Sequence, residues 1–316
     1  MKFLFVLMLA LFLAGCANEN EEQKDVVSDI VEEESTEELE EAEAIENSAV
    51  KESVDESQES ESVPEPEPFR FVDALGEWFE TTINPKVEKR DYQWECLTRE
   101  GDDVTYIGDE RYCVKKGIDV SHHQGEIDWD KVKADGYEFA IVRIAYRGYG
   151  VSTGNLHSDK RYYENIIGAQ EAGLDVGVYV FSQAINEEEA LEEAELVIDS
   201  LEGIELQLPV VFDPELIRDD TARTDEVTGE QFTKNTIVFC ERIKQAGFQP
   251  MIYSNMYWEA FLFDLEQLSE YPIWYADYEK VPQTPYHFTF WQYSEKGIVD
   301  GIAGVTDLNA WFIPCE

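Results

Sequence analysis

Two carboxylic acids, separated by one residue, end an apolar stretch of the sequence. Residues 208–216 read LPVVFDPEL, so Asp213 and Glu215 follow directly after hydrophobic positions. Side chains at positions i and i+2 of a β-strand face the same way, and both carboxyl groups should enter one pocket, with Pro214 facing away. Two close carboxyl groups cannot both ionise cheaply, which provides a proton donor beside an anion. The pair predicts general acid catalysis of the kind that cleaves glycosidic bonds.

Three more acids stand at the ends of apolar stretches, namely Asp119, Asp277 and Asp307. A single acid in such a place commonly caps a helix or forms a turn. Five acids with the same placement favour a shared site, because the carboxyl ends of barrel strands meet at one rim.

Other catalytic chemistries have little support in the sequence. His122 and His123 are adjacent, but the chain has only four histidines and no HExxH motif, so we expect no catalytic metal. A GxSxG motif is also absent, which argues against a nucleophilic serine. We expect no cofactor.

The elements that position these acids alternate between short apolar strands and amphipathic helices after Lys116. This alternation predicts an α/β fold, an irregular (β/α) TIM-like barrel over residues 117–316. The last strands leave little sequence for helices, so we expect the final hairpins to pair antiparallel. The predicted strands are 117–121, 139–146, 176–182, 209–215, 250–255, 272–278, 288–294 and 305–309, and the predicted helices are 128–136, 159–173, 187–201 and 229–247.

The N-terminal segment, MKFLFVLMLALFLAGC, is typical of a secretory signal peptide. Its last four residues resemble the bacterial lipobox, which implies cleavage before Cys16 and lipid attachment to the Cys16 sulfur. The alternative is an ordinary signal with an unmodified Cys16. We expect an extracytoplasmic protein, anchored by lipid to the bacterial cell membrane.

Residues 17–68 form a strongly acidic stretch. They carry 21 Asp and Glu against two Lys, and so contribute −19 to the net charge of −45. Without aromatic residues, this stretch should be a disordered linker, or in part a transient charged helix. The acidity of the whole chain argues against nucleic acid as a partner. Residues 69–116 contain aromatics between turn-like residues and predict a small β-rich leader.

The remaining cysteines are an even set in a chain expected to be exported, which makes them disulfide candidates. Three pairings of the four can be drawn. The short hairpin-like stretch between Cys96 and Cys113 favours a bond between these two, which leaves Cys240 for Cys315.

Several of these segments together resemble the family 25 glycoside hydrolases, lysozymes of the N-acetylmuramidase type. The resemblance implies cleavage of the β-1,4 bond between N-acetylmuramic acid and N-acetylglucosamine in peptidoglycan. It covers essentially residues 117–313, through GIDVSHHQGEIDW (117–129), FAIVRIAY (139–146), FDPE (212–215), MIYSN (251–255), PIWYADY (272–278) and FWQYSEKGIVDGIAGVTDLN (290–309).

Residue roles follow from this resemblance. It implies that Glu215 is the general acid and that Asp213 positions the substrate acetamido group, which attacks the anomeric carbon. Asp119 and Asp307 are implied as supporting acids. Pro214 replaces a small apolar residue that is common in the family, which could shift the acid pair.

Aromatic and polar side chains near the strand ends are candidates for substrate binding, because flat rings stack on sugars. These candidates are Tyr146, Tyr179, Tyr253, Trp274, Tyr275, Asp277, Gln292 and Tyr293. We expect a monomer whose partners are peptidoglycan strands and the membrane. Two alternatives are a non-catalytic peptidoglycan-binding lipoprotein with the same fold and a glycosidase acting on another amino-sugar polymer.

Overall fold

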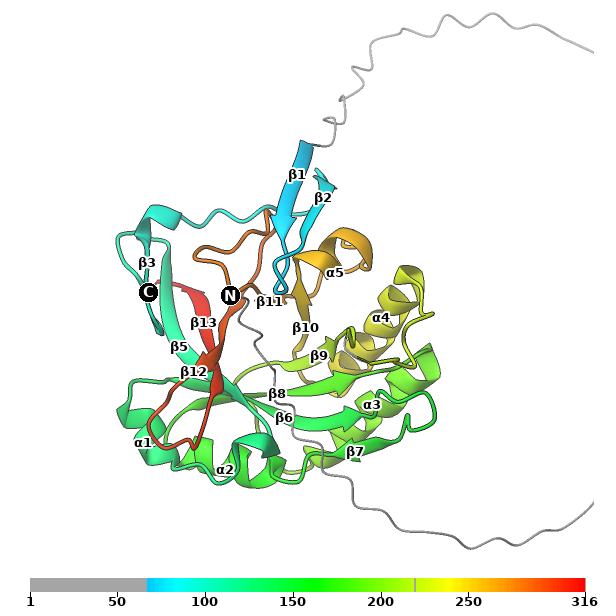
Figure 1. Cartoon of the computed structure of the whole chain (residues 1–316). Coiled ribbons are helices and arrows are strands. Elements are labelled where there is room, and N and C mark those ends of the chain that lie inside the picture. The colour runs from blue at the N-terminus through cyan, green and yellow to red at the C-terminus, as the bar shows by residue number, and fades with distance from the viewer. Residues whose placement is uncertain (1–66, 219, 316) are drawn as a thin grey trace, which may run out of the picture. The chain divides into compact units, whose positions relative to one another are not determined.

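A closed barrel of eight strands forms the centre of the computed structural model, which describes residues 67–218 and 220–315 (Figure 1). The strands follow one another around the barrel in the order β5, β13, β12, β11, β10, β9, β8 and β6, and β6 pairs with β5 again. They are β5 (Tyr112–Val120), β6 (Phe139–Arg147), β8 (Asp175–Ser182), β9 (Val210–Pro214), β10 (Pro250–Asn255), β11 (Ile273–Ala276), β12 (Phe290–Gly297) and β13 (Thr306–Pro314).

The predicted α/β barrel and its eight strands are confirmed. Neighbouring strands are parallel except at β13, which is antiparallel to both β12 and β5, as the short connections near the C-terminus predicted. A further short strand, β7 (Leu156–Ser158), pairs antiparallel with β6 and lies outside the barrel. The expected signal segment with Cys16 and residues 17–66 of the expected linker lie outside the described residues.

Helices cover the outside of the barrel only along part of its circumference (Figure 1). The four predicted helices are present, and the first turns of α1, α3 and α4 are stabilised by side-chain caps. The Asn186 side chain accepts from Glu189 N ahead of α3, and Thr228 caps α4 in the same way. The helices are α1 (Trp129–Ala134), α2 (Tyr162–Glu171), α3 (Glu187–Ser200) and α4 (Gly229–Gln245), with the short α5 (Met256–Phe261) in addition.

No helix follows β11 or β12 in the described chain, and the N-terminal leader covers the barrel there instead. The Tyr92 ring, which is buried, lies 4.4 Å from Phe312 and 5.2 Å from Phe288 between ring centroids. The leader contains two antiparallel hairpins, in agreement with its predicted β-rich character. They are formed by β1 (Glu67–Val72) with β2 (Trp78–Ile83), and by β3 (Leu97–Glu100) with β4 (Asp103–Tyr106).

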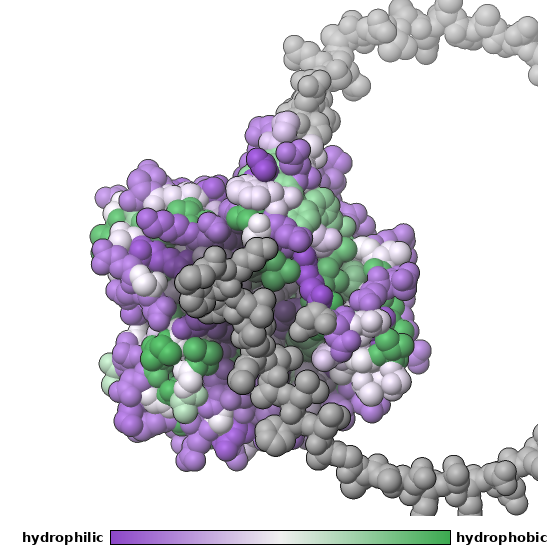
Figure 2. All heavy atoms as spheres, in the orientation of Figure 1, coloured by the Kyte–Doolittle hydropathy of each residue, from purple (hydrophilic) through white to green (hydrophobic). Residues whose placement is uncertain are grey.

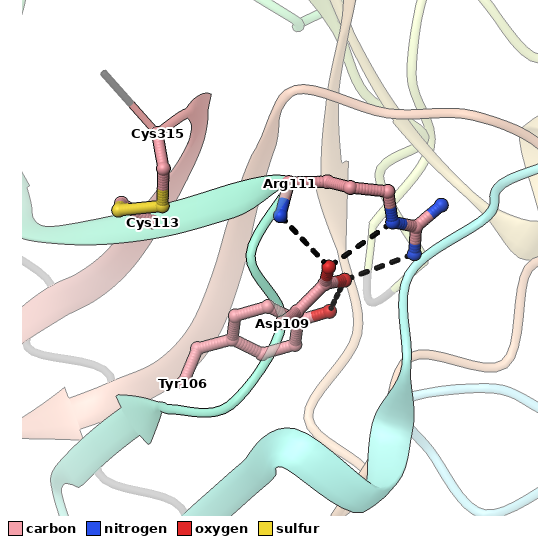
Figure 3. The surroundings of a disulfide bond; sticks show 5 residues. All are labelled: Tyr106, Asp109, Arg111, Cys113 and Cys315. Atoms are coloured by element: carbon pink, nitrogen blue, oxygen red, sulfur yellow. Dashed lines mark hydrogen bonds and ion pairs between the residues drawn. A yellow bond between two sulfur atoms is a disulfide. The ribbon is translucent and has the colours of Figure 1, made fainter.

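The disulfide bond differs from the expected pairing. Cys113 is bonded to Cys315 (Figure 3), with 5.1 Å between the two Cα atoms. The pairing of Cys96 with Cys113 and of Cys240 with Cys315 is therefore wrong, and in the described chain Cys96 and Cys240 are free. The reason lies in the barrel itself, because β13 runs antiparallel to β5 with Ile313 opposite Cys113, which brings the C-terminal residues beside the start of β5.

Candidate active site

The carboxyl ends of the barrel strands surround a pocket of about 360 Å³. Asp213 is near the end of β9 and Glu215 follows the strand, and both line this pocket, as the i and i+2 spacing predicted. Pro214 is the last residue of β9 and pairs in register with Ser182 of β8. The lining residues are Asp119, Arg143, Tyr179, Phe181, Asp213, Glu215, Tyr253, Trp274, Tyr278, Gln292, Glu295 and Asp307.

Burial raises the pKa of both acids in the central pair. Asp213 is only 3 % exposed, and its pKa is raised well above the usual range by burial and then by the charges of Glu215 and Asp119. Burial, followed by the charge of Asp119, raises the pKa of Glu215 to about 7. We expected one acid to be protonated beside an anion, whereas the pocket disfavours the charge on both. Glu215 consequently gains or loses its proton near neutral pH.

One oxygen of Asp213 has no hydrogen-bond donor. Its Oδ1 atom is buried and lacks a partner among the residues that the structure describes. An unsatisfied buried acceptor costs about 1–3 kcal/mol, so such atoms call for an explanation. Because Asp213 lines the pocket, a donor on a bound molecule could satisfy this oxygen.

Asp119 and Asp307 form a second carboxyl pair. They stand opposite each other on the antiparallel strands β5 and β13. Burial, followed by the charge of Asp119 and a hydrogen bond to it, raises the pKa of Asp307 to about 9, so Asp307 is the protonated donor. Asp119 Oδ2 also accepts from Gln292 Nε2 at 2.9 Å and from Asn309 Nδ2 at 2.7 Å. Asp119 is thus held by three donors.

Aromatic side chains orient the amides of Gln292 and Asn309, which donate to Asp119. Gln292 Oε1 accepts from the hydroxyl groups of Tyr253 at 2.8 Å and Tyr278 at 3.0 Å. Trp274 Nε1 donates to Asn309 Oδ1 at 2.8 Å. These bonds fix which end of each amide faces the carboxylate, so the rings help to shape the site.

Arg143 is a pocket residue that was not among the sequence candidates. Its Nε and Nη2 atoms donate to Asp159 Oδ2 at 3.0 and 2.9 Å, and His122 Nδ1 lies 2.8 Å from the same oxygen. The Arg143 charge opposes the rise in the pKa values of Asp213 and Glu215. A single cation inside the apolar strand FAIVRIAY was the signal that could have identified it.

Four sequence candidates lie outside this pocket. Adjacent residues in a strand face opposite sides, so Trp274 and Tyr275 cannot both point inward, and neither can Gln292 and Tyr293. Tyr293 is fully buried and donates to Asp102 O at 2.9 Å, and it lines no part of the site. Tyr275 donates to Asp277 Oδ2 at 3.0 Å, and these two residues belong to the neighbouring cavity described next.

Tyr146 is the fourth of these candidates. It packs beside His157, with 5.4 Å between the ring centroids, and its ring lies 5.1 Å from the Arg143 guanidinium. Tyr146 therefore contacts the residue that carries the pocket's cation without lining the pocket itself. The other four binding candidates, Tyr179, Tyr253, Trp274 and Gln292, all line it.

A second cavity, of about 450 Å³, continues from the pocket. Glu215, Tyr253, Tyr278 and Glu295 line both, so the two form one groove with Glu215 at their junction. Residues 71–76 of the β1–β2 hairpin line the second cavity. In Figure 2, hydrophobic residues gather beneath this hairpin on the face that is shown.

Two further features bear on the chemistry of the site. No cluster of three or more His, Cys, Asp or Glu side chains within residues 67–218 and 220–315 is arranged to hold a metal ion. No helix in the same part of the chain is long and apolar enough to cross a membrane.

Comparison with known sequences gives a consistent family match. The family model for glycosyl hydrolases family 25 matches residues 118–302. Lysozyme M1 of Streptomyces globisporus is 29% identical over 219 residues, which are 66% of this chain and 71% of that protein. The autolytic lysozyme of Clostridium acetobutylicum is 26% identical over 197 residues, or 61% of this chain. The match spans 55% of that lysozyme, about half its length.

Solved structures with the same fold include a family 25 glycosyl hydrolase from Bacillus anthracis. It is 27% identical, with a TM-score of 0.52, and the match covers 62% of this chain and 88% of that one. The modular autolysin LytC from Streptococcus pneumoniae, in complex with a synthetic peptidoglycan ligand, has a TM-score of 0.56 at 24% identity. That match covers 77% of this chain and 56% of LytC, and it supports the fold alone.

Proposed function

The chain belongs to family 25 of the glycosyl hydrolases, and on this basis we propose that it cleaves the β-1,4 bond between N-acetylmuramic acid and N-acetylglucosamine in peptidoglycan. The observation that carries the proposal is the position of Asp213 and Glu215, which line one partly buried pocket at the barrel rim. Burial raises the pKa of Glu215 to about 7, which suits a proton donor near neutral pH.

In the proposed reaction, Glu215 donates its proton to the glycosidic oxygen as the bond from that oxygen to the anomeric carbon breaks. The acetamido oxygen of the substrate forms a bond to the anomeric carbon from the opposite face. Water then attacks this carbon, gives its proton to the Glu215 carboxylate and releases the acetamido group, so that the anomeric configuration is retained. No enzyme nucleophile is required.

Asp213 has a specific part in this proposal. Its Oδ1 atom lacks a donor among the described residues, and an acetamido N–H group would supply one. A hydrogen bond to the charged form lowers the pKa of a carboxyl group, so substrate binding favours the Asp213 anion. That anion would stabilise the positive charge that develops on the acetamido group when its oxygen attacks.

The most direct test is mass analysis of peptidoglycan digested by the purified protein. New reducing ends on N-acetylmuramic acid are expected, because the proposed bond lies on its anomeric carbon. Reducing ends on N-acetylglucosamine would overturn the assignment of the bond. Binding to peptidoglycan without any product would overturn the assignment of activity. Digestion of chitin in preference to peptidoglycan would overturn the assignment of the substrate.

The pH dependence should report the Glu215 proton. Because the general acid must be protonated, and because the pKa of Glu215 is raised to about 7, kcat/KM should fall about tenfold per pH unit above that value. The measurement is kcat/KM on soluble glycan strands between pH 5 and about 9. A profile that stays flat through pH 8 would contradict the role of Glu215 as the acid.

We also propose that the protein acts outside the cytoplasm, tethered through lipid on Cys16. The sequence LAGC at residues 13–16, after an apolar segment, supports this location. The Cys16→Ala variant should then move from the membrane fraction to the soluble fraction or accumulate as uncleaved precursor, as immunoblots of cell fractions would show. An unchanged distribution of a protein of unchanged size would argue against the anchor. We also propose that it acts as a monomer.

A further inference from the structure

The β1–β2 hairpin lies outside residues 118–302 but lines the groove that contains the candidate catalytic acids. Its tip, residues 73–76, forms part of the wall of the second cavity. That cavity meets the catalytic pocket at Glu215, which lines both. A molecule that extends from the catalytic acids into the second cavity would therefore reach the hairpin tip.

The hairpin is fixed to the barrel rim by paired hydrogen bonds. Gln283 accepts from Val72 N through Oε1 and donates to Val72 O through Nε2, both at 2.9 Å. Gln283 N also donates to Asp277 Oδ2 at 2.8 Å. Behind the tip, Phe71 is fully buried and its ring centroid lies 5.4 Å from Phe79 and 6.1 Å from Phe261 of α5. These contacts hold the hairpin in one position beside the groove.

The conformation of the tip is also defined. Asp73 Oδ1 accepts from Leu75 N and Glu77 N, both at 2.9 Å, and Gly76 adopts a φ of 83°, which a glycine tolerates best. Asp73 Oδ2 pairs with Arg218 at 3.1 Å, and the Arg218 guanidinium lies over the Tyr257 ring. A wall that is ordered before binding costs little conformational entropy when a ligand arrives.

Around the hairpin tip, the surface that faces the cavity combines apolar and neutral polar groups. Leu75 is 68 % exposed and lines the cavity, together with the rings of Tyr257 and Tyr278. The Asn255 amide lies nearby, and Asp73 and Arg218 neutralise each other's charge. Amino sugars likewise have apolar ring faces that are bordered by groups able to form hydrogen bonds. The acid Glu279, which also lines the cavity and has no ion-pair partner among the described residues, disfavours the carboxylates of a peptide.

We propose that the β1–β2 hairpin tip is a substrate-binding element, which binds saccharide units of the glycan strand beyond the bond that is cut. This inference rests on the proposed function, and it extends the binding site past the part of the chain that matches the family. The hairpin makes the groove longer, so strands that reach it gain affinity.

The test compares two exposed apolar residues of the same hairpin. Leu75 lines the cavity, whereas Trp78 is 60 % exposed and does not line it. Leu75→Ser should raise KM about threefold to tenfold for long glycan strands freed of their peptides, with kcat unchanged, because this contact is made equally before and during the reaction. Trp78→Ser should leave both constants unchanged. Binding of the same strands to each variant in a Glu215→Gln background should show the same difference in Kd.

The outcomes separate this inference from the proposed function. If the wild-type protein cuts no glycan strand, the proposed function fails. If it cuts them and Leu75→Ser keeps the wild-type KM and Kd, the hairpin assignment alone is overturned. An equal loss in both hairpin variants, or a loss seen only on strands that carry peptides, would also overturn it. Matching thermal unfolding curves would exclude a folding defect, since both side chains are exposed.

Discussion

Glu215→Gln should lower kcat on peptidoglycan by about 10³-fold while leaving substrate binding nearly intact. The amide has almost the same volume as the carboxyl group but cannot release a proton to the glycosidic oxygen. Because the side chain lies at the junction of the two cavities, it faces the substrate from the middle of the groove. The measurement is the release of reducing ends, followed over hours.

A matched control for this variant is Glu202→Gln, the same chemical change at an exposed position after α3. It should keep wild-type activity. The Glu215→Gln protein should unfold at a temperature no lower than the wild type, because a carboxyl group that is costly to ionise becomes neutral. Activity within about tenfold of the wild type would mean that another group donates the proton.

Asp213→Asn should lower kcat by roughly 10²- to 10³-fold. The asparagine oxygen can still accept a hydrogen bond from the substrate, but it has no charge with which to stabilise the developing positive acetamido group. Asp130→Asn, on the exposed side of α1, provides the control. Proton NMR of the first product, recorded before mutarotation, should show the retained anomer for the wild type.

The two acid variants also separate the two proposed roles. A leaving group that needs no protonation, such as a nitrophenolate, should restore part of the bond cleavage in Glu215→Gln and none in Asp213→Asn. A wild-type kcat for Asp213→Asn would remove acetamido participation from the mechanism while leaving Glu215 as the acid. Rescue of both variants to the same extent would contradict the division of roles.

The sequence could predict the features that depend on local patterns. Apolar runs of five to eight residues identified every barrel strand, and an acid at the end of a parallel strand must lie at the common rim. This reasoning brought Asp119, Asp213, Glu215 and Asp307 into one pocket. The shortage of sequence before the last strand also predicted its antiparallel direction.

Features that depend on contacts between distant segments could not be predicted in this way. Tyr275 and Tyr293 were predicted to bind substrate together with their inward-facing neighbours, Trp274 and Gln292. Residue types alone do not show which residues of a strand face inward. The Cys113–Cys315 bond joins residues that are 202 positions apart in sequence, and it depends on the register between β5 and β13. The contact between Val72 and Gln283 spans 211 residues, and no local sequence pattern predicts it.

The strand β5 has a practical consequence for protein engineering. Five of its eight residue pairs with β13 involve residues 112–116, which precede the segment that matches the family. A catalytic module excised at Gly117 would lose these pairs, the cross-link at Cys113 and the cover that Tyr92 gives to Phe288. Chimeric lytic enzymes built from this chain should therefore include the chain from Glu67 onward, because a segment that begins at Gly117 would lack these stabilising contacts.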